Sequence, residues 1–409
     1  MNPAGRGATL ASRPAVFVGH DIYRQAAYGT LHPLAIPRVE SVVDLCNALD
    51  WLPEREYCVS PRASEAELCA FHDADYVAAL REASASGGVD MQARERYAIG
   101  TMENPLFPGL FERASTSVGG SIKAAELALR GYVAFHPAGG THHGRRDRAS
   151  GFCYFNDPVF ALRRLLAAGL ERVLYVDLDA HHGDGVEAAF TQDERVFVLS
   201  IHEAGRWPYS GALDDETGAR TCNVPVPGGF RDAELALVVD DVVLPFASAS
   251  KPQAIVITCG SDALAGDPLT SMALTNVALW DTVLRLVRCA PVAVVLGGGG
   301  YNPWTLTRYW SGLWARLSGR AIPQTLPANA REVLARLHCP LIDDDEVRPE
   351  WLATLADRPG NTPVRAEVRT LCDRLRGRMV EVAERSAEDD AKRIAPGKRA
   401  ALHEEETAR

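Results

Sequence analysis

The sequence predicts an α/β domain built around a parallel sheet. Short apolar runs that end in Gly, His, Asp or Pro recur along the chain, as expected of strands that are buried on both faces. Six of them cover residues 15–18, 132–135, 173–176, 196–199, 254–257 and 292–296. Stretches with helical periodicity separate them, at residues 111–130, 158–168, 233–248 and 272–288. This alternation of strands and helices is typical of a layered α/β fold.

Polar residues gather directly after these predicted strands. They are His136, residues 177–184, His202, Asp262 and Tyr301, the last of them behind four consecutive glycines. Ligands of such folds bind beyond the carboxyl ends of the strands. We therefore expect these distant segments to meet on one rim of the sheet.

Composition and charge exclude several classes of protein. The formal net charge of −10 argues against general nucleic-acid binding through phosphate contacts. The chain has no run of about 18 apolar residues, so no membrane helix is predicted, and its first residues lack the apolar core of a secretory signal. Nine scattered cysteines without a C-x-x-C pair indicate reduced thiols. We expect a cytoplasmic protein that binds neither nucleic acid nor a membrane.

A candidate metal site follows the strand at 173–176. Asp179 and His181 are two positions apart, and in an extended stretch such positions face the same side. Asp262, at the end of another buried strand, supplies a third ligand. Three protein ligands leave an open position for water, which is the pattern of a catalytic zinc site. A D-x-H pair alone is more typical of a surface turn, but the flanking aspartates and the second strand favour the metal.

Two adjacent histidines, His142 and His143, lie in a glycine-flanked loop. Amide hydrolysis needs a base that takes a proton from water and an acid that protonates the leaving amine. Two imidazoles can divide or share this work, each with a carboxylate that fixes its tautomer. Asp177 and Asp184, which are not assigned to zinc, are the natural partners. The alternative is a pair that satisfies local backbone groups or binds metal.

The glycine run at 297–300 lacks the spaced glycines of a dinucleotide fingerprint and the lysine of a phosphate loop. Its glycines let the backbone pass close to the site and present Tyr301. The hydroxyl of Tyr301 can stabilise the oxyanion that forms during amide hydrolysis. An isolated tyrosine would be interpreted as a core residue.

With these segments in place, the chain resembles the histone deacetylase family, most of all its class I and bacterial acetoin-utilisation-type members, to which acetylpolyamine amidohydrolases are related. The matching motifs are residues 139–143 (GGTHH), 149–157 (ASGFCYFND), 173–186, 223–225 (NVP), 261–268 and 296–302. The resemblance implies a three-layer, arginase-like fold with a central, mainly parallel eight-stranded sheet flanked by helices. It also implies zinc-dependent hydrolysis of an N-acyl amine to a free amine and a carboxylate.

The resemblance implies roles for the residues at the sheet edge. One Zn²⁺ per chain would be bound by Asp179, His181 and Asp262. The catalytic groups would be His143 with Asp184 as main base and acid, His142 with Asp177 as its electrostatic or acid partner, and Tyr301 on the carbonyl oxygen. A structural K⁺ or Na⁺ would be held by Asp177, Asp179, His181, Ser200 and Ile201. Whether Fe²⁺ replaces zinc stays open.

The resemblance also implies substrate contacts, at Gly151, Phe152, Trp207, Glu103 and Leu269. The first three would line an acyl-lysine tunnel. Glu103 stands where class I members use an aspartate on the rim to hold the substrate backbone, and its longer side chain predicts a weaker hold. Arg38 matches a buried arginine near an acetate-release channel. The substrate is acyl-lysine on a protein, an acetylated polyamine or another small acylated amine.

The predicted organisation is a single catalytic domain over residues 1–375 and a charged helix or mobile tail over 376–409, with a long loop at 84–104. Two other functions fit the sequence less well. An arginase-type ureohydrolase would need a binuclear metal centre with further Asp and His ligands. A non-catalytic acyl-lysine-binding module would be expected to have lost the metal ligands, the histidine pair or Tyr301. The oligomeric state stays open.

Overall fold

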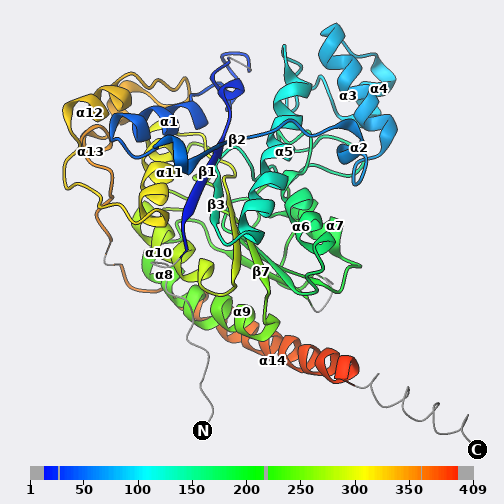
Figure 1. Ribbon diagram of the computed structural model, residues 1–409. Helices are drawn as coiled ribbons and strands as arrows, with labels where there is room; N and C mark the ends of the chain where they lie inside the picture. The colour runs from blue at the N-terminus through cyan, green and yellow to red at the C-terminus, as the bar shows by residue number, and fades with distance from the viewer. Residues whose placement is uncertain (1–12, 26–27, 216–219, 361, 395–409) are drawn as a thin grey trace, which may run out of the picture.

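The computed structural model describes residues 13–25, 28–215, 220–360 and 362–394. An eight-stranded, wholly parallel sheet runs through its centre in the order β2-β1-β3-β8-β7-β4-β5-β6 (Figure 1). The strands are β1 (Ala15–Gly19), β2 (Tyr57–Val59), β3 (Val133–His136), β4 (Val173–Asp177), β5 (Val196–Glu203), β6 (Thr221–Val226), β7 (Ala254–Thr258) and β8 (Val292–Leu296). The predicted α/β fold with a parallel eight-stranded sheet is confirmed.

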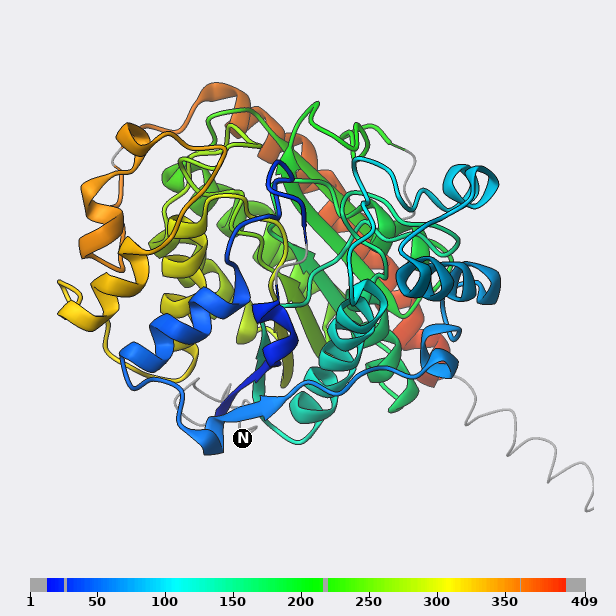
Figure 2. The same cartoon turned by 90° about the horizontal axis from the view of Figure 1, so that it is seen from above.

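Helices cover both faces of this sheet, as the view from above shows (Figure 2). They are α1 (Val39–Ala48), α2 (Glu65–Leu68), α3 (Ala74–Ser86), α4 (Met91–Tyr97), α5 (Leu110–Leu129), α6 (Asp157–Ala167), α7 (Asp184–Phe190), α8 (Asp232–Val238), α9 (Leu244–Ser250), α10 (Asn276–Val287), α11 (Pro303–Leu317), α12 (Ala328–Ala335), α13 (Pro349–Ala353) and α14 (Ala366–Ile394). None of the helices in the described ranges is both long and apolar enough to cross a bilayer.

Alternate residues of each strand point into opposite layers, because side chains of a strand alternate between its two faces. On one face, Phe17 and Phe135 belong to the same buried cluster as the tryptophans of α10 and α11, which are Trp280, Trp304, Trp310 and Trp314. On the other face, Val16 and Ala134 cluster with apolar residues of α5, α6 and α7. Both faces are therefore covered, which explains why the central strands are continuous apolar runs.

The two strands that the apolar runs did not predict both lie at the edges of the sheet. β2 has only three residues, and none of them is fully buried. β6 contains Asn223 and Pro225, so it is no continuous apolar run. Proline is tolerated at an edge because one side of the strand needs no hydrogen-bond donor.

Two helical predictions and one loop prediction differ from the structure. The stretch 233–248 is not one helix, since a π-helical turn at Val239–Val243 separates α8 from α9. The helix predicted at 272–288 begins only at Asn276. The Thr275 side chain caps it by accepting a hydrogen bond from the Ala278 N–H. The predicted loop at 84–104 contains α4, which the Asp90 side chain caps in the same way.

α14 packs against α9 and α8, two of the helices that cover the sheet (Figure 1). Its buried side chains recur every three or four residues, as in an amphipathic helix. They are Val368, Leu371, Cys372, Leu375, Met379 and Val382. The helix runs through residue 376 without a break, and residues 395–409 of the predicted tail lie outside the described residues. The domain division at residue 375 stays a prediction.

Candidate metal and catalytic centre

The site lies at the carboxyl edge of the sheet, after four neighbouring strands. β3, β8, β7 and β4 are adjacent, and the loops that follow them contain the histidine pair, Tyr301, Asp262 and the 177–184 segment, in that order. Carboxyl ends of parallel strands share one edge, so segments far apart in the sequence meet there. The structure brings these residues together at one edge. His136 and His202, which were expected at the same edge, lie within β3 and β5, where their rings contact the Val18 and Ser117 carbonyls and the Gly211 carbonyl, respectively.

Three buried side chains converge at this edge. One donor atom from each of Asp179, His181 and Asp262 lies within 4.8 Å of the others. His181 Nδ1 is 2.9 Å from Asp262 Oδ2 and 3.3 Å from Asp179 Oδ1. Burial and the charge of Asp179 together raise the pKa of Asp262 to about 6. Two buried carboxylates and an imidazole nitrogen fit a divalent cation, which would relieve this repulsion.

The glycine run passes directly against this triad. The Gly299 N–H donates to Asp179 Oδ2 at 2.5 Å. A Cβ at Gly299 would lie 2.2 Å from Asp262 Oδ2. A side chain at this position would therefore displace the carboxylates, which is the physical reason for a glycine beside them.

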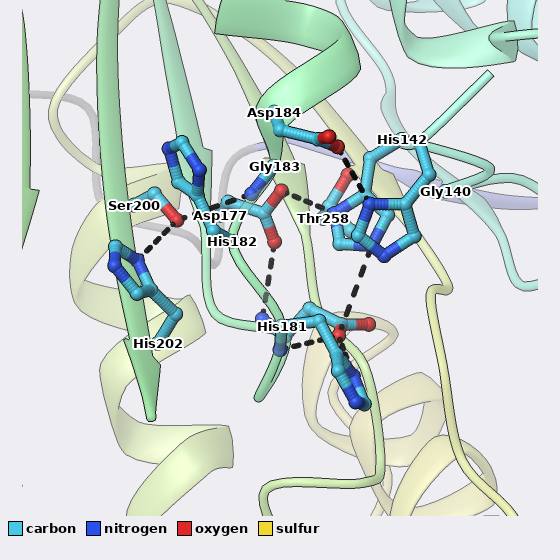
Figure 3. Close-up of polar contacts among 12 residues, drawn as sticks. Gly140, His142, Asp177, His181, His182, Gly183, Asp184, Ser200, His202 and Thr258 are labelled. Carbon is cyan, nitrogen blue, oxygen red and sulfur yellow. Dashed lines mark hydrogen bonds and ion pairs between the residues drawn. The ribbon is translucent and has the colours of Figure 1, made fainter. Parts of the chain in front are cut away.

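Each histidine of the pair is backed by one carboxylate. His142 Nδ1 lies 2.7 Å from Asp177 Oδ2 (Figure 3), and His143 Nδ1 lies 2.7 Å from Asp184 Oδ1. A carboxylate only accepts hydrogen bonds, so Nδ1 of each ring carries the proton. The ring centroids are 3.9 Å apart. Nε2 of each ring is therefore the atom available for proton transfer.

The pKa values of the two rings are shifted in opposite directions. Burial disfavours the charged form of both, but the carboxylates of Asp177 and Asp179 outweigh it at His142 and raise its pKa to about 9. At His143, burial and the neighbouring charge of His142 lower the pKa to about 3. An imidazole with a raised pKa therefore lies next to one with a lowered pKa.

A pocket of about 460 Å³ reaches the triad at His181. The five residues expected to contact substrate all line it, and so do His143, His181 and Tyr301. The Trp207 ring lies 4.6 Å from His143 between centroids, and the Phe152 ring 5.9 Å from Tyr301. Burial raises the pKa of Tyr301 well above its ordinary value, which keeps the hydroxyl protonated as a donor.

The pocket also contains residues that sequence reasoning did not single out. Glu203, Arg206 and Tyr209 line it, and Arg206 donates to Glu203 Oε1 and to the Leu269 carbonyl. The hydrogen bond from Arg206 to the Leu269 carbonyl joins the loop after β5 to the loop after β7. Glu203, Arg206 and Tyr209 carry no local sequence signal, because the predicted strand ends at residue 199, four positions before Glu203.

The remaining predicted positions lie around this centre. Asp177 pairs in register with Ser200 on the neighbouring strand β5, and Ile201 is the next residue of that strand. Arg38 donates to the Gly298 carbonyl at 2.5 Å. It lines a smaller cavity of about 100 Å³ that shares Phe152 with the main pocket.

Comparison with known proteins gives consistent matches. The family model of the histone deacetylase domain matches residues 32–317. The acetoin utilization protein AcuC of Bacillus subtilis is 33% identical over 323 residues, which are 75% of this chain and 83% of that protein. Histone deacetylase 8 of Xenopus tropicalis is 33% identical over 301 residues, 71% of this chain and 81% of that protein.

Solved structures agree with these matches. The crystal structure of an HDAC homolog from Aquifex aeolicus has a TM-score of 0.86 at 35% identity and covers 89% of this chain and 100% of its own. The structure of an HDAC homolog complexed with SAHA has a TM-score of 0.85 at the same identity and coverage.

Proposed function

The chain belongs to the histone deacetylase family, and on that premise we propose that it is a zinc-dependent hydrolase. It would remove an acyl group, chiefly an acetyl group, from an amine. One observation carries the proposal. Two histidines, each backed by its own carboxylate, lie beside three converging metal-ligand side chains, and His143 and His181 of this group line a pocket with aromatic walls.

Asp179, His181 and Asp262 are the residues that would hold the metal. Their nitrogen and oxygen donors are the types that zinc prefers, and three protein ligands leave room for a water molecule and the substrate. When bound, the ion would act as a Lewis acid toward the substrate carbonyl and the attacking water.

His143 is assigned to take the proton from the attacking water. Its Nδ1–H donates to Asp184, which leaves the Nε2 lone pair as the acceptor, and the ring lines the pocket. Arg145 donates to the same carboxylate and so fixes its orientation. A base held in one tautomer and one orientation loses little freedom when the proton moves.

His142 and Tyr301 complete the assignment. His142 lies between Asp177 and the triad, with Nε2 3.8 Å from Asp179 Oδ1, where its charge would stabilise the reacting centre and its proton could pass to the leaving amine. Tyr301 lines the pocket from the loop after β8, and its hydroxyl would donate to the oxyanion.

The walls favour a neutral acyl chain on an alkyl stem. Phe152 and Trp207 supply apolar ring surfaces next to His143, so an acyl-lysine in a protein, an acetylated polyamine or another small acylated amine would fit. We extend the proposal to a K⁺ or Na⁺ held by Asp177, Asp179, His181, Ser200 and Ile201. Its basis is the family resemblance together with the register of Asp177 and Ser200.

A substrate panel with metal analysis tests the proposal. We expect about one divalent ion per chain, turnover of an acetyl-lysine peptide, loss of turnover after chelation and recovery with Zn²⁺. Asp179→Ala and Asp262→Ala should lose both metal and activity. Asp214→Ala, whose side chain is 82% exposed, serves as the control and should lose neither. Full turnover by metal-stripped protein would contradict the mechanism.

A further inference from the structure

Glu103 turns its carboxylate toward the wall of the pocket. Oε1 accepts a hydrogen bond from the Gly151 N–H at 3.0 Å. Oε2 lies 3.4 Å from Nδ2 of Asn104, whose amide also donates to the Ala98 carbonyl at 3.2 Å. Both carboxylate oxygens therefore already have donors within the chain.

The wall that Glu103 contacts has an unusual backbone. Gly151 and Phe152 have φ angles of +54° and +65°, so two consecutive residues lie in the left-handed region. A phenylalanine rarely adopts this conformation without support from its surroundings. The fit is also tight, since a Cβ at Gly151 would lie 2.3 Å from the Trp207 ring. A small shift of this segment would change the width of the pocket.

The Glu103 loop also supports Phe152 through His32. Nδ1 of His32 accepts from the Leu34 N–H at 3.1 Å, so Nε2 carries the proton and donates to the Glu103 carbonyl at 3.3 Å. The His32 ring contacts Phe152 with 4.7 Å between centroids. Glu103 thus holds the Gly151–Phe152 wall twice, through its carboxylate at Gly151 and through its carbonyl by way of His32.

We propose that Glu103 is a positioning residue that fixes the Gly151–Phe152 wall and does not hold the backbone of a substrate. The inference rests on the proposed function and narrows its substrate class. If the Glu103 carboxylate serves to hold Gly151, recognition falls on the acyl group and its alkyl stem. An acylated primary amine such as acetyl-lysine amide should be hydrolysed about as well as the same residue within a peptide.

The test measures kcat and KM for acetyl-lysine amide and for an acetyl-lysine peptide. Glu103→Ala should lower kcat/KM about tenfold or more, by the same factor for both substrates within about twofold, because misplaced walls impair reactive geometry whatever flanks the stem. Glu103→Gln keeps an acceptor oxygen for the Gly151 N–H and should recover most of the loss. Met102→Ala, at the neighbouring residue with 93% exposure, is the matched control and should behave as the parent.

Two kinetic outcomes overturn the proposal. A loss confined to the peptide would show that Glu103 contacts the substrate backbone, and no loss for either substrate would show that the wall does not depend on it. Hydrogen exchange of the segment around Gly151 gives a readout without turnover. It should be faster in Glu103→Ala but unchanged in Glu103→Gln and Met102→Ala. If the parent hydrolyses neither substrate, the proposed function fails, while hydrogen exchange still decides the role of Glu103.

Discussion

The backbone N–H of Tyr301 donates a hydrogen bond to the buried carboxylate of Asp267, with 2.8 Å between N and Oδ2. The other carboxylate oxygen of Asp267 accepts from the Leu269 N–H at 2.9 Å. Both partners line the main pocket. Asp267 therefore connects the loop after β7 to the loop after β8 at the point where Tyr301 enters the site.

Replacement of Asp267 should impair turnover by way of Tyr301. Asn keeps one acceptor oxygen and Ala none, so kcat should fall from parent to Asp267→Asn to Asp267→Ala, by about tenfold or more for Ala. In a Tyr301→Phe background the further loss should be much smaller, because the hydroxyl that Asp267 positions is already absent. Steady-state kinetics of the single and double variants measures this coupling. Additive losses would place the effect of Asp267 elsewhere.

Tyr301→Phe removes one hydroxyl and leaves the ring contacts in place. We expect normal folding and metal content, with kcat lowered by roughly 10²–10³, the typical effect of one lost oxyanion donor. Metal analysis and thermal unfolding serve as controls for the kinetic measurement. If turnover stays within a few-fold of the parent, Tyr301 only packs against Phe152 and His181.

His143→Ala should damage turnover more than His142→Ala. Nε2 of His143 is the acceptor that faces the pocket, and a general acid–base group contributes roughly 10²–10⁴ in rate. Neither residue belongs to the metal-ligand triad, so both variants should retain the metal. The comparison of their kcat values at equal metal content checks the assignment, and the opposite ranking would exchange the two roles.

His72 should make the fold sensitive to acid. The ring is buried, its Nδ1–H donates to the Arg145 carbonyl at 2.9 Å, and its Nε2 accepts from the Asn156 N–H at 3.2 Å. Burial lowers its pKa to about 4 from the ordinary value of 6.5. Its contribution to stability is therefore complete above pH 6.5 and is lost as the pH falls toward 4, because only the unfolded chain takes up the proton.

The size of this effect is on the order of 3 kcal/mol across that window, since each pKa unit corresponds to about 1.4 kcal/mol. Urea unfolding at pH 8, 6 and 5 measures it. His72→Gln cannot titrate, so its free energy of unfolding should change less between pH 8 and 5 than that of the parent, even if it is lower at every pH. If the free energy of unfolding depends equally on pH in the two proteins, His72 does not cause the acid sensitivity.

Local pattern was sufficient for much of the fold. The six strands that are buried on both faces were predicted because burial by two helical layers demands an unbroken apolar run, as in 254–257. The edge strands β2 and β6 were not predicted, because an edge position does not demand an unbroken apolar run. β2 has only three residues, and β6 contains Asn223 and Pro225. The break between α8 and α9 also escaped prediction, because the apolar pattern of 233–248 continues through the π-helical turn.

The candidate site was also predictable from the sequence only in part. Asp179 and His181 could be paired from their spacing, and strand order then explains why Asp262 and Tyr301 reach them. The partner of Glu103 was decided by the tertiary structure alone. The family resemblance implied a carboxylate on the rim that holds the substrate backbone, and only the folded chain shows that the Gly151 N–H lies 3.0 Å from this carboxylate. A hydrogen bond between residues 48 positions apart leaves no periodicity in the sequence, because it depends on how two loops pack and not on the residues next to either partner.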